Sequence, residues 1–329
     1  MNANTVFDPI FGHEEQCRQL TALLQGRAVP HALMFAGPSG IGKRTVALRF
    51  AAALLSPSSS PDQTQTLIAS GNHPDLHFLA REPEKRDLPV EAIRALTTKL
   101  QLKPYCGTCS VAIIDNAHEM NLAASNALLM TLEEPPPDTY LILTTDAPQV
   151  LPQTIVSRCQ ILHFTHLNRK QLTTIIEYLL PGQADASLLN ALAAYGDSSL
   201  EPLRIEQFIN AKTSIVRDPE ALVQHLQELL GHIRRLDKLL EPLFSAGPEK
   251  EQLAYPVALA THIAGDDALL SVCWHTIMSK LRENMRHSAS PGPCADALLA
   301  VVDAEKLTRQ RSLNMTLQLS NVLMKIAQC

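Results

Sequence analysis

The sequence predicts an α/β domain built on a five-stranded parallel sheet, followed by a small helical lid and an all-α C-terminal domain. Two observations lead to this fold class. Between residues 32 and 164, short apolar runs alternate with helical patterns, as in stacked βαβ units. After Phe164 the strand patterns stop and only helical periodicity follows. We therefore place the domains at 1–165, 166–210 and 211–329.

The predicted strands are short and apolar throughout, as expected in a parallel sheet that is covered on both faces. They are 32–36, 76–79, 111–114, 140–144 and 161–164.

Helices are predicted between these strands. One apolar helix face consists of Val46, Ala47, Phe50, Ala51 and Leu54. This helix ends at a surface loop, the Ser/Pro-rich segment 56–61. A second apolar face consists of Leu122, Leu129 and Leu132, and the triple proline 135–137 ends that helix.

The C-terminal part is predicted to be helical throughout. Short helices are broken at 181–182 and at Gly196, and further helices are expected near 257–287 and 295–327. An apolar stripe consists of Leu222, Leu226, Leu229, Ile233, Leu236 and Leu240. This stripe fits either the core of a helical bundle or a face for self-association.

Charge and hydropathy exclude several classes of protein. With 28 Lys and Arg against 33 Asp and Glu, the net charge is -5, so the chain is not a polycation that coats nucleic acid. Any contact with DNA is local or shared with partners. No run approaches the length of a membrane span, and residues 1–11 lack the pattern of a signal peptide. We expect a cytoplasmic protein that does not bind membranes.

Seven scattered cysteines favour reduced thiols over disulfides. Only Cys106 and Cys109 form a Cys-x-x-Cys pair, which is either half of a metal site or two thiols beside a strand. Because a structural zinc needs four ligands and no second pair lies nearby, zinc is not expected.

A glycine-rich segment follows the first strand and precedes a helix. It reads Gly37-Pro38-Ser39-Gly40-Ile41-Gly42-Lys43-Arg44-Thr45, the pattern of a phosphate loop. Gly37, Gly40 and Gly42 let successive N–H groups point at a phosphate, and Lys43 can reach the outer phosphates. Nucleotide binding is therefore the favoured interpretation of this loop.

The loop departs from the pattern at the magnesium ligand. The residue after the lysine is normally Ser or Thr, whose hydroxyl holds Mg²⁺, and here it is Arg44. Thr45 comes one position later, turned by about 100° around the helix, so it does not simply replace that ligand. Metal-assisted hydrolysis is expected to be compromised.

Asp115 ends the apolar strand 111–114, where an acid lies beside a phosphate-bound Mg²⁺ in nucleotide-hydrolysing enzymes. A carboxylate that caps the following turn explains it equally well. In active ATPases of this architecture a Glu follows and orients the attacking water. Here Asn116 follows, which cannot act as a base.

Several later segments resemble one known family. They are 116–120 (Asn-Ala-His-Glu-Met), 124–130 (Ala-Ser-Asn-Ala-Leu-Leu-Met), 131–136 (Thr-Leu-Glu-Glu-Pro-Pro) and 151–160 (Leu-Pro-Gln-Thr-Ile-Val-Ser-Arg-Cys-Gln). These segments resemble the bacterial DNA polymerase III clamp-loader subunits, the AAA+ branch shared by the gamma/tau and delta-prime chains. The resemblance is strong over 7–164, weaker to 210, and faint in the last third, where 314–317 is similar to the family's final helix.

The positions at which this sequence departs from the ATPase pattern resemble those of the delta-prime chains. Resemblance to gamma/tau would imply an intact magnesium Ser/Thr and an Asp-Glu pair, whereas delta-prime chains tolerate the loss of both. Segments 71–76 and 103–105 also look like delta-prime. The family's four zinc cysteines have no counterpart in the interval 54–71, which implies that the zinc module is missing or metal-free. The lid segment 196–201 lacks the sensing Arg that the ATPases of the family tend to carry.

The Ser-Arg-Cys resemblance implies that Arg158 is an arginine finger, a cation that acts in trans on the γ-phosphate held by a neighbouring subunit. The alternative is an Arg paired with a local carboxylate at a strand end. Thr144 and Thr145 lie at the family's first nucleotide sensor, although a β-branched pair that closes a strand explains them equally well. Arg94 is interpreted as a solvated or structural charge.

The resemblance implies a delta-prime subunit of the replicative clamp loader. Such a chain forms a hetero-oligomeric ring with gamma/tau and delta subunits through its C-terminal collar, and helps to place the sliding clamp on primed DNA. The sequence leaves open whether the chain's own loop binds ATP, ADP or no nucleotide, and whether it binds magnesium. One rival is an autonomous gamma/tau-like ATPase motor, against which Arg44 and Asn116 argue. The other is a lone DNA-binding module, which the acidic balance disfavours.

Overall fold

The computed structural model comprises two compact units, which we describe separately. The first contains Met1–Leu179 with Ser198–Pro219, and the second contains Leu180–Asp197 with Glu220–Cys329. The residues that the structure describes are 6–8, 10–26, 29–56, 64, 67–68, 70–82, 85, 87–106, 108–182, 186–196, 199–203, 205, 218–244, 254–287, 292–309 and 314–327. Most of the predicted loop 56–61 and the boundary at 210–211 lie outside them.

The first unit is built on a sheet of five parallel strands, which confirms the predicted fold class. Its order is β2-β3-β4-β1-β5. The strands are β1 (Ala32–Ala36), β2 (Leu76–Leu79), β3 (Ser110–Ile114), β4 (Thr139–Thr145) and β5 (Gln160–His163). All five were predicted, with boundaries within one residue.

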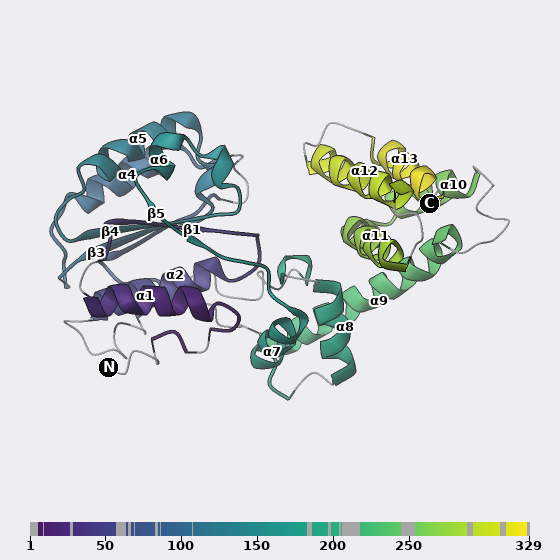
Figure 1. The fold of residues 1–329 in the computed structure, drawn as a ribbon, viewed down its shortest axis with the longest axis horizontal. Coiled ribbons are helices and arrows are strands. Elements are labelled where there is room, and N and C mark those ends of the chain that lie inside the picture. The colour runs from purple at the N-terminus through teal and green to yellow at the C-terminus, as the bar shows by residue number, and fades with distance from the viewer. Residues whose placement is uncertain are drawn as a thin grey trace. The chain divides into compact units, whose positions relative to one another are not determined.

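Helices cover both faces of this sheet, as Figure 1 shows. Helices α1 (Glu14–Gly26) and α2 (Lys43–Leu55) lie on one face. On the other lie α4 (Val90–Leu100), α5 (Leu122–Glu133) and the short α6 (Gln153–Val156). The inner strands β1 and β3 are buried along their whole length, because each of their faces packs against a helical layer.

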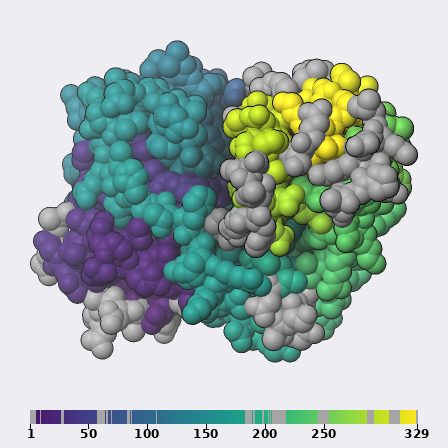
Figure 2. All heavy atoms as spheres, turned by 45° about the vertical axis from the view of Figure 1, so that its right-hand side comes forward, coloured from purple at the N-terminus to yellow at the C-terminus, as the bar shows by residue number. Residues whose placement is uncertain are grey.

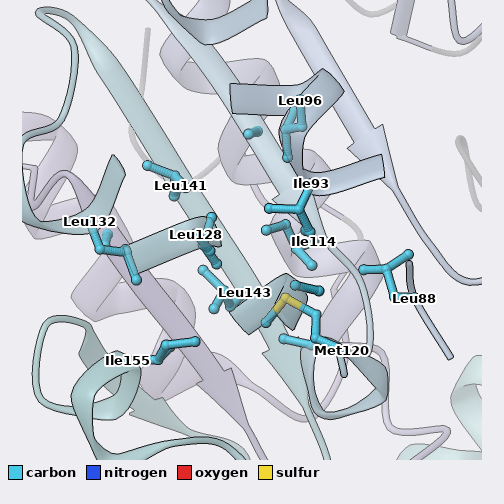
Figure 3. Close-up of a cluster of buried hydrophobic side chains, with 14 of the residues drawn as sticks. Leu88, Ile93, Leu96, Ile114, Met120, Leu128, Leu132, Leu141, Leu143 and Ile155 are labelled. Atoms are coloured by element: carbon cyan, nitrogen blue, oxygen red, sulfur yellow. The ribbon is translucent and has the colours of Figure 1, made fainter. Parts of the chain in front are cut away.

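Interlocking aliphatic side chains form the core between the sheet and the second helical layer (Figure 3). Leu128 and Leu132 of α5 meet Leu141 and Leu143 of β4, and Ile93 of α4 lies over the same sheet face. Burial of each such side chain contributes about 1.5–3 kcal/mol relative to its exposed state. This core fixes α5 and the strand ends that carry the candidate site.

The predicted apolar face of α2 is confirmed, since all five of its residues are buried. The predicted face of α5 is wrong at one position. Leu122 is 69% exposed, and the helix instead buries the face that carries Ala124, Leu128 and Leu132. Residues spaced by four follow one face of a helix, and Leu122 lies outside that row.

The strand order brings the chemistry-bearing loops to one edge of the sheet. Ala36, at the end of β1, pairs with Thr145, at the end of β4, and Ile114 of β3 pairs with Leu143 of β4. In open parallel sheets, ligands bind outside the carboxyl ends of the strands where the chain order reverses. Both the phosphate loop and Asp115 follow strands at this edge.

The second unit is helical, as predicted. It contains α8 (Ala186–Gly196), most of α9 (Pro219–Phe244), α10 (Ala254–Ala264), α11 (Asp267–His287), α12 (Gly292–Arg309) and α13 (Met315–Ala327). All six residues of the stripe on α9 are buried, so the core interpretation is confirmed. Helix α13 packs against α10 and α12, and its yellow atoms lie against those of the preceding helices in Figure 2.

The two longest predicted helical stretches each divide into two helices at a polar cap. Asp266 Oδ1 accepts the N–H groups of Ala268 and Leu269 at the start of α11, and Asn314 Oδ1 accepts those of Thr316 and Leu317 at the start of α13. No helix among the described residues is long and apolar enough to cross a membrane.

The predicted lid 166–210 contains residues of both compact units. Helix α7 (Arg169–Leu179) belongs to the first unit, whereas α8 belongs to the second. The division into three domains therefore stays a prediction.

Candidate functional site

The phosphate-loop segment lies between β1 and α2, as predicted. Gly40 and Gly42 have φ angles of 68° and 99°, in the left-handed region that favours glycine. A Cβ on Gly37 would collide with the carbonyl oxygen of Phe164, which follows β5. Gly40 and Gly42 thus turn the chain, and Gly37 lets the segment after β5 approach. An added Cβ on Gly42 would meet open space, so its backbone conformation alone favours glycine there.

A distant segment closes over this loop. Leu200 N donates to Gly40 O at 3.0 Å, and a Cβ on Gly40 would lie 2.6 Å from Glu201 N. In the sequence this segment is distinguished only by its missing Arg. No local pattern could have revealed the contact, because 160 residues separate its two sides.

Lys43 is buried, with 6% of its surface exposed, and it points back into its own loop. Its Nζ donates to Gly37 O at 2.7 Å and to Pro38 O at 2.5 Å. Desolvation lowers the pKa of Lys43, and the negative charges of Asp146 and Asp115 oppose that shift. The ammonium is thereby satisfied by carbonyl oxygens of the loop.

Arg44 and Asp115 form an ion pair. Arg44 Nε donates to Asp115 Oδ2 at 2.8 Å, and the guanidinium carbon lies 5.9 Å from the centre of the Phe78 ring. The Asp115 side chain is 5% exposed. Thr45 lies beside Arg44 in the first turn of α2 and is partly buried.

Thr144 completes this cluster from the adjacent strand. Its hydroxyl donates to Asp115 Oδ1 at 2.6 Å and accepts the N–H of Asn116 at 3.0 Å. The structure thus brings Arg44, Asp115 and Thr144 together, as expected for residues at one sheet edge. The Asp115 oxygens bond to side chains from α2 and β4. These bonds of Asp115 therefore go to side chains of other elements, and not to the backbone of the turn that follows β3.

Thr145 belongs to a separate cluster. Its hydroxyl lies 3.3 Å from His118 Nδ1 and accepts the N–H of Ala147 at 3.2 Å. His118 Nε2 in turn lies 3.0 Å from Asp146 Oδ1. These contacts order the segment that follows β4.

The residues at the magnesium position do not fit that ion. Mg²⁺ requires oxygen ligands in octahedral geometry, usually a hydroxyl and a carboxylate beside the phosphates. Here the hydroxyl position is a guanidinium, and that guanidinium already binds the carboxylate. Asn116 adds no base.

His13 is a residue of this region that the sequence analysis missed. It is buried, its Nε2 lies 2.6 Å from Ile41 O, and its ring meets that of Phe164 edge-on at 4.9 Å. Burial lowers the pKa of its imidazole. The neutral side chain holds the phosphate loop from the α1 side, and a single His at the start of a helix gives no sequence signal for such a role.

Arg158 lies between α6 and β5, at the end of the sheet opposite to the phosphate loop. Gln160 at the start of β5 pairs with Leu33, whereas the loop begins after Ala36. At about 3.3 Å per residue, the two sites are roughly 10 Å apart along the strands alone. Arg158 therefore does not belong to the cluster around Asp115.

The Arg158 guanidinium bonds to two groups of its own chain. It donates to Thr154 O at 3.1 Å and pairs with Glu133 Oε1 at 2.8 Å. Glu133 comes from the Leu-Glu-Glu-Pro-Pro segment at the end of α5, so the local pairing weighed in the sequence analysis is present. The two side chains are 36% and 51% exposed, and such pairs contribute only about 0–1 kcal/mol.

Cys106 and Cys109 are both free thiols. Cys109 is buried and donates to Leu54 O at 3.4 Å, and burial raises its pKa to about 11. In the described part of the chain, no three His, Cys, Asp or Glu side chains gather as metal ligands. Arg94 is exposed on α4.

Comparisons with known proteins extend this description. Residues 12–168 match the family described as DNA polymerase III, delta subunit. The DNA polymerase III subunit delta' of Bacillus subtilis is 27% identical over 290 residues, which cover 84% of either chain. The subunit delta' of Pseudomonas aeruginosa is 37% identical over 147 residues, 43% of this chain and 45% of that one.

A subunit of the tau type is similar to this chain as well. The DNA polymerase III subunit tau of Bacillus subtilis is 28% identical over 237 residues, which are 71% of this chain and 40% of tau. The family match includes the phosphate loop, Asp115 and Arg158. Over residues 12–168, just under half of its length, this chain is thus similar to DNA polymerase III subunits of the delta' and tau types.

Proposed function

We propose that this chain is a delta-prime-type subunit that lends Arg158 to the ATP site of an adjacent gamma/tau subunit and does little hydrolysis itself. The observation that carries the proposal is the position of Arg158. It lies at the sheet end opposite to the chain's own phosphate loop, on the surface, in a Ser-Arg-Cys segment. A guanidinium there can serve a phosphate on another chain far more readily than one on its own.

The weak hold on Arg158 supports this role. Its partner Glu133 is half exposed, so exchange of the carboxylate for a γ-phosphate costs little free energy. The fork of a guanidinium suits the oxygens of a phosphate, and its charge is permanent. In the transition state of phosphoryl transfer, a cation at this place neutralises developing charge.

Similarity to DNA polymerase III subunits supports a proposal for the partners. We propose that the chain joins gamma/tau and delta subunits in a hetero-oligomeric ring, and that it meets the sliding clamp and primed DNA through this complex. Relatives named delta' and tau support membership of such a complex. The helical second unit is the proposed collar that joins the ring.

ATP or ADP at the chain's own loop is a weaker proposal. Lys43 would have to leave the carbonyl groups of Gly37 and Pro38, and a phosphate would approach Asp146 and Glu201, whose charges act on Lys43. Both conditions oppose tight binding.

The rival function is an autonomous ATPase motor, which the match to tau chains favours. Arg44 and Asn116 argue against it. Arg44 provides no hydroxyl ligand for Mg²⁺ and is bonded to Asp115, and Asn116 cannot act as the base that orients the attacking water. Incubation of the purified chain with Mg²⁺ and ATP separates the two. Turnover near about 1 per second, at the low end of ordinary enzyme rates, would favour the motor.

The arginine finger is tested in the assembled loader. Arg158→Ala is expected to lower DNA-stimulated ATP turnover at the neighbouring site by about tenfold or more, because transition-state charge loses its cation. Size-exclusion chromatography should show the same complex as with the unchanged chain. The control is Arg94→Ala, which removes an exposed arginine from α4 of the same unit. Equal turnover of the two variants would remove the finger role.

A further inference from the structure

The Asp115 carboxylate has a cation within this chain, the Arg44 guanidinium. One carboxylate oxygen accepts from Arg44 Nε at 2.8 Å and the other from the Thr144 hydroxyl at 2.6 Å. The carboxylate is almost completely buried, whereas Arg44 is 38% exposed. A carboxylate at this depth needs a counter-charge, because water no longer stabilises it.

Arg44 is also positioned from a second side. Its guanidinium carbon lies 5.9 Å from the centre of the Phe78 ring on β2, a distance at which an aromatic face attracts a cation. Strand β2 pairs with β3, and Asp115 N donates to Leu79 O at 2.8 Å. The carboxylate and the ring thus belong to one rigid sheet edge, and the guanidinium contacts both.

This ion pair takes up both positions that hold a metal in phosphate-loop enzymes. Arg44 stands where the loop supplies the hydroxyl ligand, and Asp115 stands where the strand supplies the carboxylate. We propose that Arg44 replaces the divalent cation at this site, so that the phosphate-loop region is charge-balanced and folded without metal or nucleotide. This inference is independent of the role proposed for Arg158.

Thermal unfolding of the full chain tests the proposal with Mn²⁺ alone as the probe. Arg44→Thr removes the guanidinium and restores a hydroxyl beside Asp115. In EDTA its midpoint should fall by roughly 5 °C, because the buried carboxylate loses its partner. Millimolar Mn²⁺ should raise the midpoint of this variant by several degrees, because an ion that binds only the folded state stabilises it. The unchanged chain should not respond.

Two further variants separate counter-charge from packing. Arg94→Thr, on the exposed face of α4, should show neither the loss nor the response to Mn²⁺. The double variant Arg44→Thr/Asp115→Asn carries no unpaired carboxylate, so it should recover part of the lost stability and ignore Mn²⁺. If Arg44→Thr alone does not fold, folding of the double variant supports the proposal.

Three results would overturn the proposal. The unchanged chain would gain as much stability from Mn²⁺ as Arg44→Thr does. A folded Arg44→Thr would show no response to Mn²⁺. Neither Arg44→Thr nor the double variant would fold, in which case Arg44 matters for packing rather than for its charge.

Discussion

Asp75 shows how one buried carboxylate organises a loop far from it in sequence. Its Oδ1 accepts Tyr105 N–H at 2.5 Å and its Oδ2 accepts Cys106 N–H at 2.9 Å. These bonds hold the segment that leads into β3, at whose end Asp115 lies. The side chain is buried, so no water replaces a lost partner.

Asp75→Asn is expected to lower the free energy of unfolding by about 1–3 kcal/mol, because the amide nitrogen must face a backbone donor. Guanidinium denaturation of the purified chain measures the loss. Glu91→Gln, an exposed change on α4, is the control and should alter stability by less than about 0.5 kcal/mol. An unaltered midpoint for Asp75→Asn would show that the loop does not depend on this carboxylate.

At the residue scale, the sequence predicted the members of the site better than their partners. Arg44, Asp115 and Thr144 were identified because each follows or ends a recognisable element. Their mutual bonds could not be predicted, because pairing across α2, β3 and β4 depends on side-chain geometry. The sequence allowed a local carboxylate as a partner of Arg158, but it did not identify that carboxylate as Glu133.

Among the elements, the strands were predicted most closely, and the reason is physical. A strand buried on both faces is apolar throughout, so it stands out from its polar flanks. Helix α5 was predicted in place, but its predicted apolar face was wrong at Leu122. A leucine at its exposed first turn looked like part of the apolar face, although Ala124 and Leu128 define that face. Small buried residues give a weak hydrophobic signal.

The phosphate loop as an element depends on Gly40. Gly40→Ala should lower the free energy of unfolding by about 2 kcal/mol, because a side chain at φ 68° is strained and its Cβ would lie 2.6 Å from Glu201 N. Urea denaturation checks this value. At Gly26, at the end of α1, an added Cβ would meet no other part of the chain within 4 Å, so Gly26→Ala should leave stability unchanged or raise it. Equal effects of the two substitutions would contradict the described closure of the loop by segment 199–203.

The whole molecule divides its chemistry between two ends of one sheet. At the carboxyl end, Lys43 and Arg44 bind groups of this chain. At the other end, the partners of Arg158 among the described residues are an exposed glutamate and a backbone carbonyl. The phosphate loop of this chain is thus internally satisfied, and under the proposed function the Arg158 cation serves a neighbouring chain.

The central claim is that Arg158 acts on another chain, and a structure of the assembled loader with a non-hydrolysable ATP analogue tests it directly. The predicted result is an Arg158 guanidinium released from Glu133 and within hydrogen-bond distance of the γ-phosphate held by the adjacent subunit. A guanidinium still paired with Glu133, with no phosphate of any subunit within reach, would contradict the account.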